Sequence, residues 1–477
     1  MRPRPTVSMI VAAVVLAASA AFAQQGAADG EWRSFAGDLG STKYSTLDQI
    51  DADNVGTLRV AWRRPLVDAA YLAVDPELRF SSVSRAAPVI VDGVGYVPNG
   101  IGLVEAFDLG TGDTRWTQPP FGGPDELRGT GTRGVAYWTD GTSARILVQR
   151  GEYLYALDPD TGETIWAFRE PETVRFLRSP RRSYGKGVAY AEVNGRGVIY
   201  ITTPAFFLWA LDAKTGRPLE NWGAPVPLDD FEQTGVVDLV PELLEDWGQW
   251  ERWDEGPYDA DYGVPRELGM VTASAPPIVV NGVVVVLVGH QPSYGQTRIE
   301  NIPGDIMGFD ARTGERLWKF HVIPRPGEFG HETWENDAWE WTGDVSSWAP
   351  MTADPELGLV YVVTNGVTID YYGGHHPGDN LFSTSVIALD AETGERRWQF
   401  NLLSPPWSGV MATAGGLVFG GSQEGNIFAL DADSGEPLWS FYAGAATRTN
   451  PMSYQHAGKQ YVVMSGGYGV FVFGLKD

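Results

Sequence analysis

The amino-acid sequence predicts an all-β protein, a β-propeller of four-stranded antiparallel blades, on three observations. The 58 glycines and 18 tryptophans among 477 residues indicate many tight turns between aromatic-rich strands. One phrase, Asp-x-x-Thr/Ser-Gly with a tryptophan shortly after it, occurs six times. The aspartates of successive phrases are 50, 54, 98, 80 and 41 residues apart. A period of about 40–50 residues with four strands per unit is typical of a propeller blade.

The repeated phrase predicts a hairpin turn. In "VIALDAETGERRWQFN" (386–401) and its copy "IFALDADSGEPLWSF" (427–441), an apolar strand precedes the turn and a strand with a large ring follows it. The aspartate carboxylate can accept backbone N–H groups of its own turn, and the glycine supplies a residue with positive φ. The tryptophan is suited to an interface with another sheet. The six aspartates are Asp108, Asp158, Asp212, Asp310, Asp390 and Asp431.

A second hairpin signal stands upstream of several copies, at Asp92-Gly93, Asn194-Gly195 and Asn281-Gly282. One unit therefore has about four short strands, and since a single sheet cannot bury both faces, the units are expected to form a ring. Six phrases predict six blades. The N-terminal "TLRVAWRR" around Trp62 and the C-terminal strands are expected to complete a seventh and close the ring. Unrelated hairpins or a β-sandwich would not repeat one turn six times.

The N-terminal residues 1–23 are expected to be a secretory signal peptide. Arg2 and Arg4 precede an apolar stretch that ends in Ala21-Phe22-Ala23, a small-x-small cleavage pattern; a retained anchor is the alternative. Cleavage would leave residues 24–477 as a single propeller domain, periplasmic and without a membrane span. Removing two arginines changes the formal charge from −25 to −27. So acidic a surface disfavours nucleic acid and anionic lipid as partners.

The chain contains no cysteine, so neither disulfides nor a Cys-x-x-Cys-His haem motif can form. Three long connections, 226–270, 322–347 and 366–384, interrupt the repeats and are expected to carry function, because long loops on a rigid ring usually do. The first is acidic, lacks strand alternation and is expected to contain one helical turn at "PELLEDW".

Several phrases resemble the periplasmic quinoprotein dehydrogenases that use pyrroloquinoline quinone (PQQ). They include "TRGVAYWTDG", "EWTGDVSSWAPM", "GLVYVVTNGVTIDYYGGHHPGDNLFSTSVIALDAETGERRW" and "GKQYVVMSGG". The likeness covers 31–401 and 405–475. It favours the glucose-dehydrogenase-type branch, because the methanol-dehydrogenase branch carries adjacent cysteines where Leu127 and Arg128 stand here.

The resemblance implies oxidation of an alcohol or a sugar by hydride transfer to the quinone. In the family, a Ca²⁺ ion acts as Lewis acid on the quinone carbonyl and an aspartate takes the hydroxyl proton. The electrons then pass to ubiquinone or a cytochrome.

The resemblance also suggests residues for each role, with an alternative for each. Trp348 matches the floor under the quinone; otherwise it is an interblade packing ring. Arg133 matches the arginine that grips the quinone oxygens, but "YGKGVAY" places Lys186 in an equivalent phrase, so either could be the grip or a surface charge. For the metal, Glu300 and Asn365 are the candidate oxygen ligands. A solvated rim carboxylate is the alternative for Glu300, and Asn365 is one residue out of register.

One segment of the family pattern is missing. In the family, the equivalent of Trp398-Gln399-Phe400 leads into the segment that holds the proton-abstracting aspartate, and about two further blades follow. Here 401–404 replace all of it, so seven blades are expected instead of eight and the catalytic base is unknown. Three explanations stand: a segment lost from the gene model or clone, a natural relative that binds without turnover, or another base. The intact flanks favour the first.

Two functions outside redox chemistry remain open. One is a non-catalytic propeller scaffold like the outer-membrane assembly lipoproteins, which share the repeated turn but usually begin with a lipobox cysteine. The other is a periplasmic sugar-binding ring. The adjacent pair His375-His376 is expected to be structural or substrate-facing, because neighbouring side chains in a loop rarely share one metal.

Overall fold

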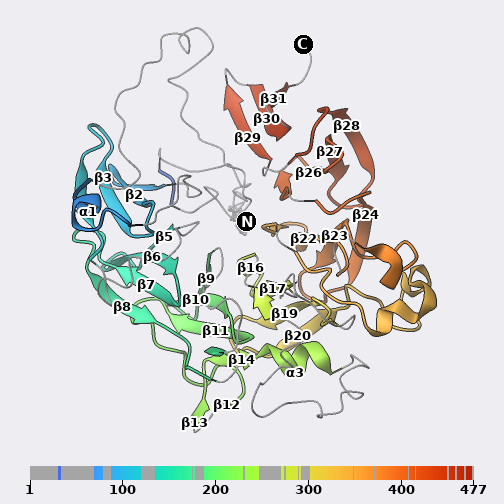
Figure 1. The fold of residues 1–477 in the computed structure, drawn as a ribbon, viewed down its shortest axis with the longest axis horizontal. Helices are drawn as coiled ribbons and strands as arrows, with labels where there is room; N and C mark the ends of the chain where they lie inside the picture. The colour runs from blue at the N-terminus through green and yellow to red at the C-terminus, as the bar shows by residue number, and fades with distance from the viewer. Residues whose placement is uncertain are drawn as a thin grey trace, which may run out of the picture.

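The computed structural model shows a ring of antiparallel sheets (Figure 1). The residues it describes are 31–33, 69–78, 88–119, 135–173, 176–177, 187–228, 231–245, 270–272, 275–287, 289–291, 301–347, 349–368, 372–406, 408–413, 415–447, 451–456, 459–466 and 469–474.

Within these residues, six sheets have four strands and the C-terminal sheet has three, in agreement with the expected seven blades. The first three sheets are β1 (Val89–Val91), β2 (Val94–Pro98), β3 (Val104–Asp108) and β4 (Thr114–Thr117); β5 (Val135–Thr139), β6 (Ala144–Arg150), β7 (Tyr153–Leu157) and β8 (Thr164–Phe168); and β9 (Ala189–Val193), β10 (Arg196–Thr203), β11 (Phe207–Asp212) and β14 (Val236–Asp238).

The remaining sheets follow in chain order around the ring (Figure 1). They are β16 (Ile278–Val280), β17 (Val283–Leu287), β19 (Ile306–Asp310) and β20 (Arg316–Phe320); β21 (Thr352–Asp354), β22 (Leu359–Val363), β23 (Ser385–Asp390) and β24 (Arg396–Asn401); β25 (Met411–Thr413), β26 (Leu417–Gly421), β27 (Asn426–Asp431) and β28 (Pro437–Tyr442); and β29 (Met452–His456), β30 (Lys459–Gly466) and β31 (Gly469–Gly474).

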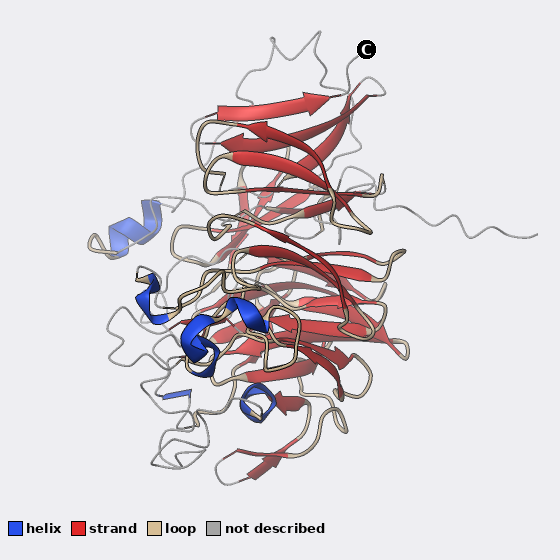
Figure 2. Cartoon of the chain, turned by 90° about the vertical axis from the view of Figure 1, so that its right-hand side faces the viewer, coloured by secondary structure: helices blue, strands red, loops and turns tan. Residues whose placement is uncertain are grey.

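The helices are short and lie in the connections. They are the α-helices α1 (Ala69–Val74) and α3 (Leu239–Leu244) and the 3₁₀-helices η4 (His331–Thr333), η5 (Glu335–Glu340) and η6 (Gly373–His375). In the side view they gather on one side of the sheets (Figure 2). No helix among the described residues is both long and apolar enough to cross a membrane.

Each repeated turn folds as its sequence predicts. In the last copy, the Asp431 carboxylate accepts the backbone N–H groups of Asp433 (3.1 Å) and Ser434 (2.8 Å). Gly435 has φ +74° and its N–H donates to the Asp431 carbonyl at 2.9 Å. The carboxylate thus accepts the backbone N–H groups that the turn leaves without partners. The glycine adopts a left-handed conformation that a residue with a side chain would resist.

The tryptophan of one blade docks on the turn of the next blade. The Trp398 indole N–H donates to the carbonyl of Ala432 at 2.9 Å, and a Cβ on Gly435 would lie 2.4 Å from the ring. Both halves of the repeated phrase therefore belong to one interblade joint. A tryptophan ring meets the glycine of the next blade in four further pairs: Trp116 on Gly162, Trp166 on Gly216, Trp222 on Gly314 and Trp318 on Gly394.

The core lies between the sheets. Val284 and Val286 of β17 pack with Tyr200 and Leu208 of the preceding sheet in one buried cluster. The opposite face of β17 contributes Val285 to a second cluster, shared with the following sheet. Such two-sided burial explains why the middle strands are continuous apolar runs.

The third blade corrects one expectation about 226–270. This stretch does contain strands: β12 (Val226–Leu228) pairs with β13 (Phe231–Gln233), and β14 supplies the outer strand of the third blade by pairing with β11. After this turn the chain forms only an isolated bridge between Pro218 and Leu211. The proline alone does not explain the difference, because Pro437 has the same place after the sixth turn and begins β28. The expected helical turn is confirmed as α3.

The C-terminal sheet has three strands, and the fourth, expected around Trp62, lies outside the described residues. On its other side, Trp439 of β28 has no repeated turn to dock on. Its side chain is 38% exposed and meets Phe473 of β31 edge-on at 4.8 Å. The tryptophan thus makes a looser contact here than at the other joints.

Candidate functional site

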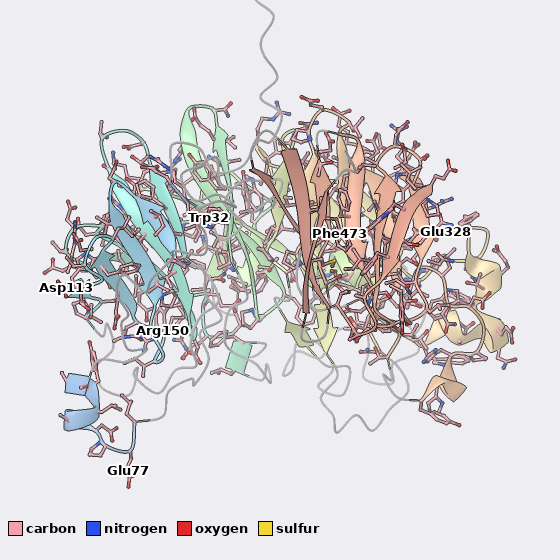
Figure 3. The ribbon with its side chains drawn as sticks, turned by 90° about the horizontal axis from the view of Figure 1, so that it is seen from above. Trp32, Glu77, Asp113, Arg150, Glu328 and Phe473 are labelled. Carbon is pink, nitrogen blue, oxygen red and sulfur yellow. The ribbon has the colours of Figure 1, made fainter. Side chains whose placement is uncertain are left out.

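The helices of the described connections lie on one face of the ring (Figure 2). In a four-stranded antiparallel sheet, the link between the second and third strands and the link to the next blade leave from the same end. The helices lie on that face (Figure 2), and α1, followed by Glu77, projects beyond the sheet ends (Figure 3). The repeated turns lie on the opposite face. We call the first the loop face and the second the turn face.

Of the sequence-predicted site residues, the structure describes Asn365 alone, in a connection of the loop face. Asn365 follows β22 directly and is buried, with 6% of its surface exposed. Arg133, Lys186, Glu300 and Trp348 lie outside the described residues. Their roles stay predictions, and only their described chain neighbours can be placed.

Three segments of the loop face are joined by backbone hydrogen bonds: 301–304, 342–347 and 364–368, here called the three-segment network. The Gly304 N–H donates to the Asp344 carbonyl at 2.7 Å, and the Asp344 N–H donates to Ile302 at 3.0 Å. The Asn365 N–H donates to the Ser346 carbonyl at 2.7 Å. The middle segment therefore pairs with both of the others.

The network brings together chain neighbours of three predicted site residues. Asn301 follows Glu300, Ser347 precedes Trp348, and Asn365 is itself a member. A side-chain bond from Asn301 Nδ2 to Thr368 Oγ1, 67 residues apart in the chain, joins the first segment to the third. Parts of two connections that the sequence singled out, 322–347 and 366–384, thus meet the segment 301–304 on the loop face.

Three buried side-chain atoms in the network have no hydrogen-bond partner: Asn301 Oδ1, Ser346 Oγ and Asn365 Nδ2. Turning the Asn365 amide over would present its oxygen in place of the nitrogen. Unpartnered polar atoms are rare in protein interiors, and each calls for an explanation. Amide and hydroxyl oxygens are ligands that Ca²⁺ accepts, so the network fits a hard cation.

Sequence reasoning missed Asn301, Ser346 and Asp344. The run "GDVSS" (343–347), small polar residues beside the predicted quinone floor, was the available signal. Asp344 is 5% exposed and lies at the centre of the network. Among the described residues, no group of three or more His, Cys, Asp or Glu side chains could hold a metal ion. A cation site here would need neutral oxygens as well.

A buried carboxylate, Asp305, directly follows the first segment of the network. Asp305 is fully buried, and its Oδ2 lies 3.8 Å from Lys319 Nζ and 3.9 Å from Arg325 Nη2. Its Oδ1 accepts the Val322 N–H at 3.0 Å. These contacts tie the end of segment 301–304 to the connection after β20, so the group has a structural role.

The histidine pair makes loop contacts. His376 Nδ1 lies 2.8 Å from Asn380 Oδ1, and the His375 carbonyl accepts the Trp341 indole N–H at 3.2 Å. The first contact lies within the connection 372–380, and the second holds this connection against 335–341. These contacts are structural.

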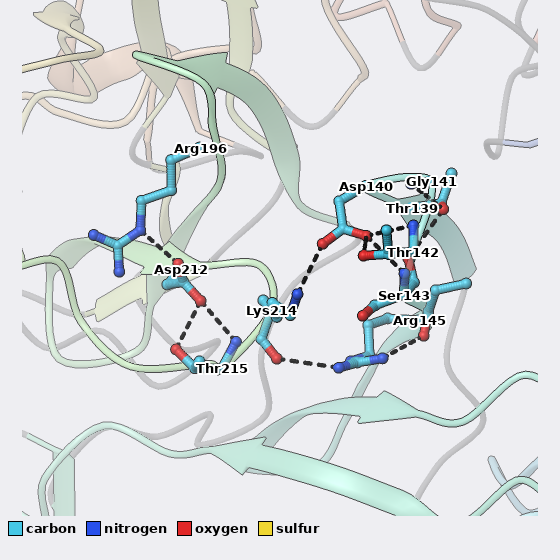
Figure 4. Close-up of polar contacts among 11 residues, drawn as sticks. Thr139, Asp140, Gly141, Thr142, Ser143, Arg145, Arg196, Asp212, Lys214 and Thr215 are labelled. Carbon is cyan, nitrogen blue, oxygen red and sulfur yellow. Dashed lines mark hydrogen bonds and ion pairs between the residues drawn. The ribbon is translucent and has the colours of Figure 1, made fainter.

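Carboxylates of the turn face are committed to structural bonds. Asp140, in the hairpin between β5 and β6, accepts bonds from Thr142 and Ser143, and Lys214 of the next blade donates to it at 3.1 Å (Figure 4). The Thr142 bonds, followed by those of Ser143 and Lys214, hold the Asp140 pKa well below its usual range. Asp212 pairs with Arg196 at 2.5 Å. Such partners leave these groups poorly suited to proton transfer.

Comparison with known proteins defines the class. The sequence model described as "Glucose/ethanol/alcohol dehydrogenase, beta-propeller domain" matches residues 32–153 and 146–404. The chain therefore belongs to the PQQ-dependent dehydrogenase propeller family. A second model, described as "Outer membrane protein assembly factor BamB", matches residues 383–476. The expected family and fold class are both confirmed.

Individual relatives carry dehydrogenase names. The chain is 34% identical to the glycerol dehydrogenase large subunit of Gluconobacter oxydans (strain 621H) over 252 residues, which are 51% of this chain and 29% of that protein. It is 25% identical to the dehydrogenase subunit of the alcohol dehydrogenase (quinone) of Komagataeibacter europaeus over 552 residues. This alignment covers 92% of this chain and 72% of that protein. The solved quinohemoprotein alcohol dehydrogenase of Comamonas testosteroni superposes with a TM-score of 0.44 at 20% identity. The superposition covers 94% of this chain and 78% of that chain.

The comparisons agree with a segment missing from this chain. The 552-residue alignment is longer than the whole chain of 477 residues, so it contains positions at which this chain has no residue. The match to the dehydrogenase model ends at residue 404, the end of the stretch 401–404 that replaces the family segment. Across this stretch, the Trp398–Gly435 joint is formed like the others.

Proposed function

We propose that this protein is a periplasmic dehydrogenase that binds PQQ and Ca²⁺ and oxidises an alcohol or a sugar. The observation that carries the proposal is the dehydrogenase model matched over 32–404, which includes every predicted site residue. The convergence of 301–304, 342–347 and Asn365 on the loop face supports it.

Residues of this chain would hold the cofactor and the metal. Trp348 would lie under the flat quinone, where an indole provides stacking area. Arg133 or Lys186 would donate to its oxygens. Glu300 and Asn365 would offer oxygen to the cation. When bound, the quinone supplies the acceptor for hydride and two electrons.

The proton acceptor is unassigned, because the family segment that carries the aspartate is absent. Electrons would leave to ubiquinone or a cytochrome, and the signal peptide 1–23 would direct the chain to the periplasm. The names of the relatives favour an alcohol over a glucose-like substrate.

Cofactor loading tests the proposal. Purified protein is incubated with PQQ and Ca²⁺, passed through gel filtration, and assayed for quinone absorbance and for dye reduction with alcohols, glycerol and glucose. We expect retained quinone, with loss of retention in Asn365→Ala and normal retention in the control Asn426→Ala, which lies outside the network. Retained quinone without dye reduction would identify a binding-competent ring that lacks its base. No retained quinone would refute the proposal.

A second candidate is a non-catalytic propeller scaffold. The match of residues 383–476 to the BamB model favours it, since that region carries the repeated turns without the long loops. The same experiment separates the two, because a scaffold needs neither quinone nor Ca²⁺.

A further inference from the structure

We infer that Asp344, Asn301 and Ser346 supply ligand oxygens to a Ca²⁺ site beside Asn365 in the three-segment network. The inference rests on the proposed function, because Ca²⁺ is the metal of that reaction. It assigns ligands that the sequence resemblance does not name.

The first support is that two buried side-chain oxygens of the network have no hydrogen-bond partner. Asn301 and Ser346 are fully buried, and neither Asn301 Oδ1 nor Ser346 Oγ has a hydrogen-bond partner. The other end of the Asn301 amide is fixed, since Nδ2 donates to Thr368 Oγ1 at 2.5 Å. Its oxygen is therefore held in place without a bond of its own. A cation would satisfy such acceptors where hydrogen-bond donors are lacking.

Backbone geometry is the second support. Asp344 and Val345 both have φ of +59°, a conformation that L residues rarely adopt and that a β-branched side chain resists. Glycines flank this turn closely: a Cβ on Gly343 would lie 2.4 Å from the Ile302 carbonyl oxygen, and one on Gly304 would lie 2.4 Å from Ser346 Cβ. Strain of this kind is retained where the surroundings enforce it, often at ligand sites.

The donor chemistry selects the metal. One carboxylate and three neutral oxygen-bearing side chains form a hard donor set without nitrogen or sulfur ligands, as Ca²⁺ prefers. Asp344 brings negative charge to the centre of the network, where its backbone bonds to both Ile302 and Gly304. Asp344 would therefore contribute most of the affinity for Ca²⁺, and the neutral oxygens would contribute less.

The test measures metal binding directly on the full-length protein. Metal-free protein is titrated with Ca²⁺ by calorimetry and with Tb³⁺ by tryptophan-sensitised luminescence, both without quinone; the Trp341 carbonyl accepts the Asn301 N–H at 2.8 Å, which places an indole residue beside the network. We expect the Ca²⁺ dissociation constant to rise roughly tenfold or more in Asp344→Asn and several-fold in Ser346→Ala.

The control is Asp354→Asn, because Asp354 also accepts the N–H groups of its own turn, from Glu356 (2.9 Å) and Leu357 (3.0 Å), and lies outside the network. It should leave Ca²⁺ binding unchanged. Far-UV circular dichroism confirms that each variant is folded.

The outcomes separate this inference from the proposed function. Absence of Ca²⁺ binding by the unmodified protein, or unchanged affinity in folded Asp344→Asn, would overturn the ligand assignment. If Ca²⁺ binds as expected but no quinone is retained, the ligands stand and the dehydrogenase proposal fails. If quinone is retained while the variants bind Ca²⁺ normally, the dehydrogenase proposal stands and this inference fails.

Discussion

Replacing Gly435 with alanine tests the interblade joint where the ring crosses the missing segment. The new Cβ would lie 2.4 Å from Cδ2 and 2.5 Å from Cε3 of Trp398. The Trp398 side chain is only 4% exposed, so the surrounding residues prevent it from moving away. The ring would have to move, which strains its hydrogen bond to the Ala432 carbonyl. Gly416→Ala is a matched control, since Gly416 has nearly the same φ, +71° against +74°, and its Cβ would meet nothing within 4 Å.

The magnitude follows from the difference between the two sites. Both variants carry the cost of a left-handed alanine, about 1–2 kcal/mol, offset by about 0.4–1 kcal/mol from the unfolded chain. Only Gly435→Ala adds overpacking of about 1–3 kcal/mol and weakening of a hydrogen bond worth about 1 kcal/mol. The free energy of unfolding should therefore fall by about 1–4 kcal/mol more at Gly435 than at Gly416.

Urea unfolding followed by circular dichroism measures both variants. In a Trp398→Ala background, the extra cost of Gly435→Ala should disappear, because the ring that it meets is gone. Equal destabilisation by Gly435→Ala and Gly416→Ala, in the presence of Trp398, would refute the docking of this ring on the glycine.

Three further predictions concern packing and pH. Trp398→Ala should lower the free energy of unfolding by about 3–5 kcal/mol. Trp439→Ala should lower it by less than half as much, because Trp439 is 38% exposed. Equal losses measured by urea unfolding would contradict the looser contact between Trp439 and the C-terminal sheet. The pKa of Asp140 lies below its ordinary 3.8, so stability should be lost as pH falls below about 4, and less steeply in Asp140→Asn, as thermal unfolding across acid pH will show. Burial raises the pKa of Tyr200 and Tyr361 above the ordinary 10.0, so stability should fall as pH rises past about 10; an equally steep fall in the double variant Tyr200→Phe/Tyr361→Phe would contradict this.

The sequence predicted most of the fold because its signals are local. The turn phrase needs only an acceptor, a positive-φ glycine and flanking strands, all within a few residues of Asp431. It also indicated an interface role for the tryptophan. The sequence did not predict the third blade, where the chain after the turn makes only an isolated bridge and β14 arrives from further along to fill the outer position. A strand recruited from a long connection leaves no periodic signal at the place it fills.

The candidate site was predicted only in part. Motif resemblance indicated Asn365, and its burial in the network is compatible with that role. Asn301, Ser346 and Asp344 carry no motif, because their proposed role depends on which backbone segments lie side by side.

By itself the sequence determined the repeated turn, the sheet-rich class, the approximate number of blades and the family to which the chain belongs. These properties arise from residues close together in the chain, where spacing fixes hydrogen bonding and burial. Only the tertiary structure decided which tryptophan meets which glycine. It also decided that 301–304, 342–347 and 364–368 lie together and that buried polar atoms of Asn301, Ser346 and Asn365 have no hydrogen-bond partner. These contacts join neighbouring blades, so they depend on how the sheets pack against one another, and no local pattern encodes that geometry.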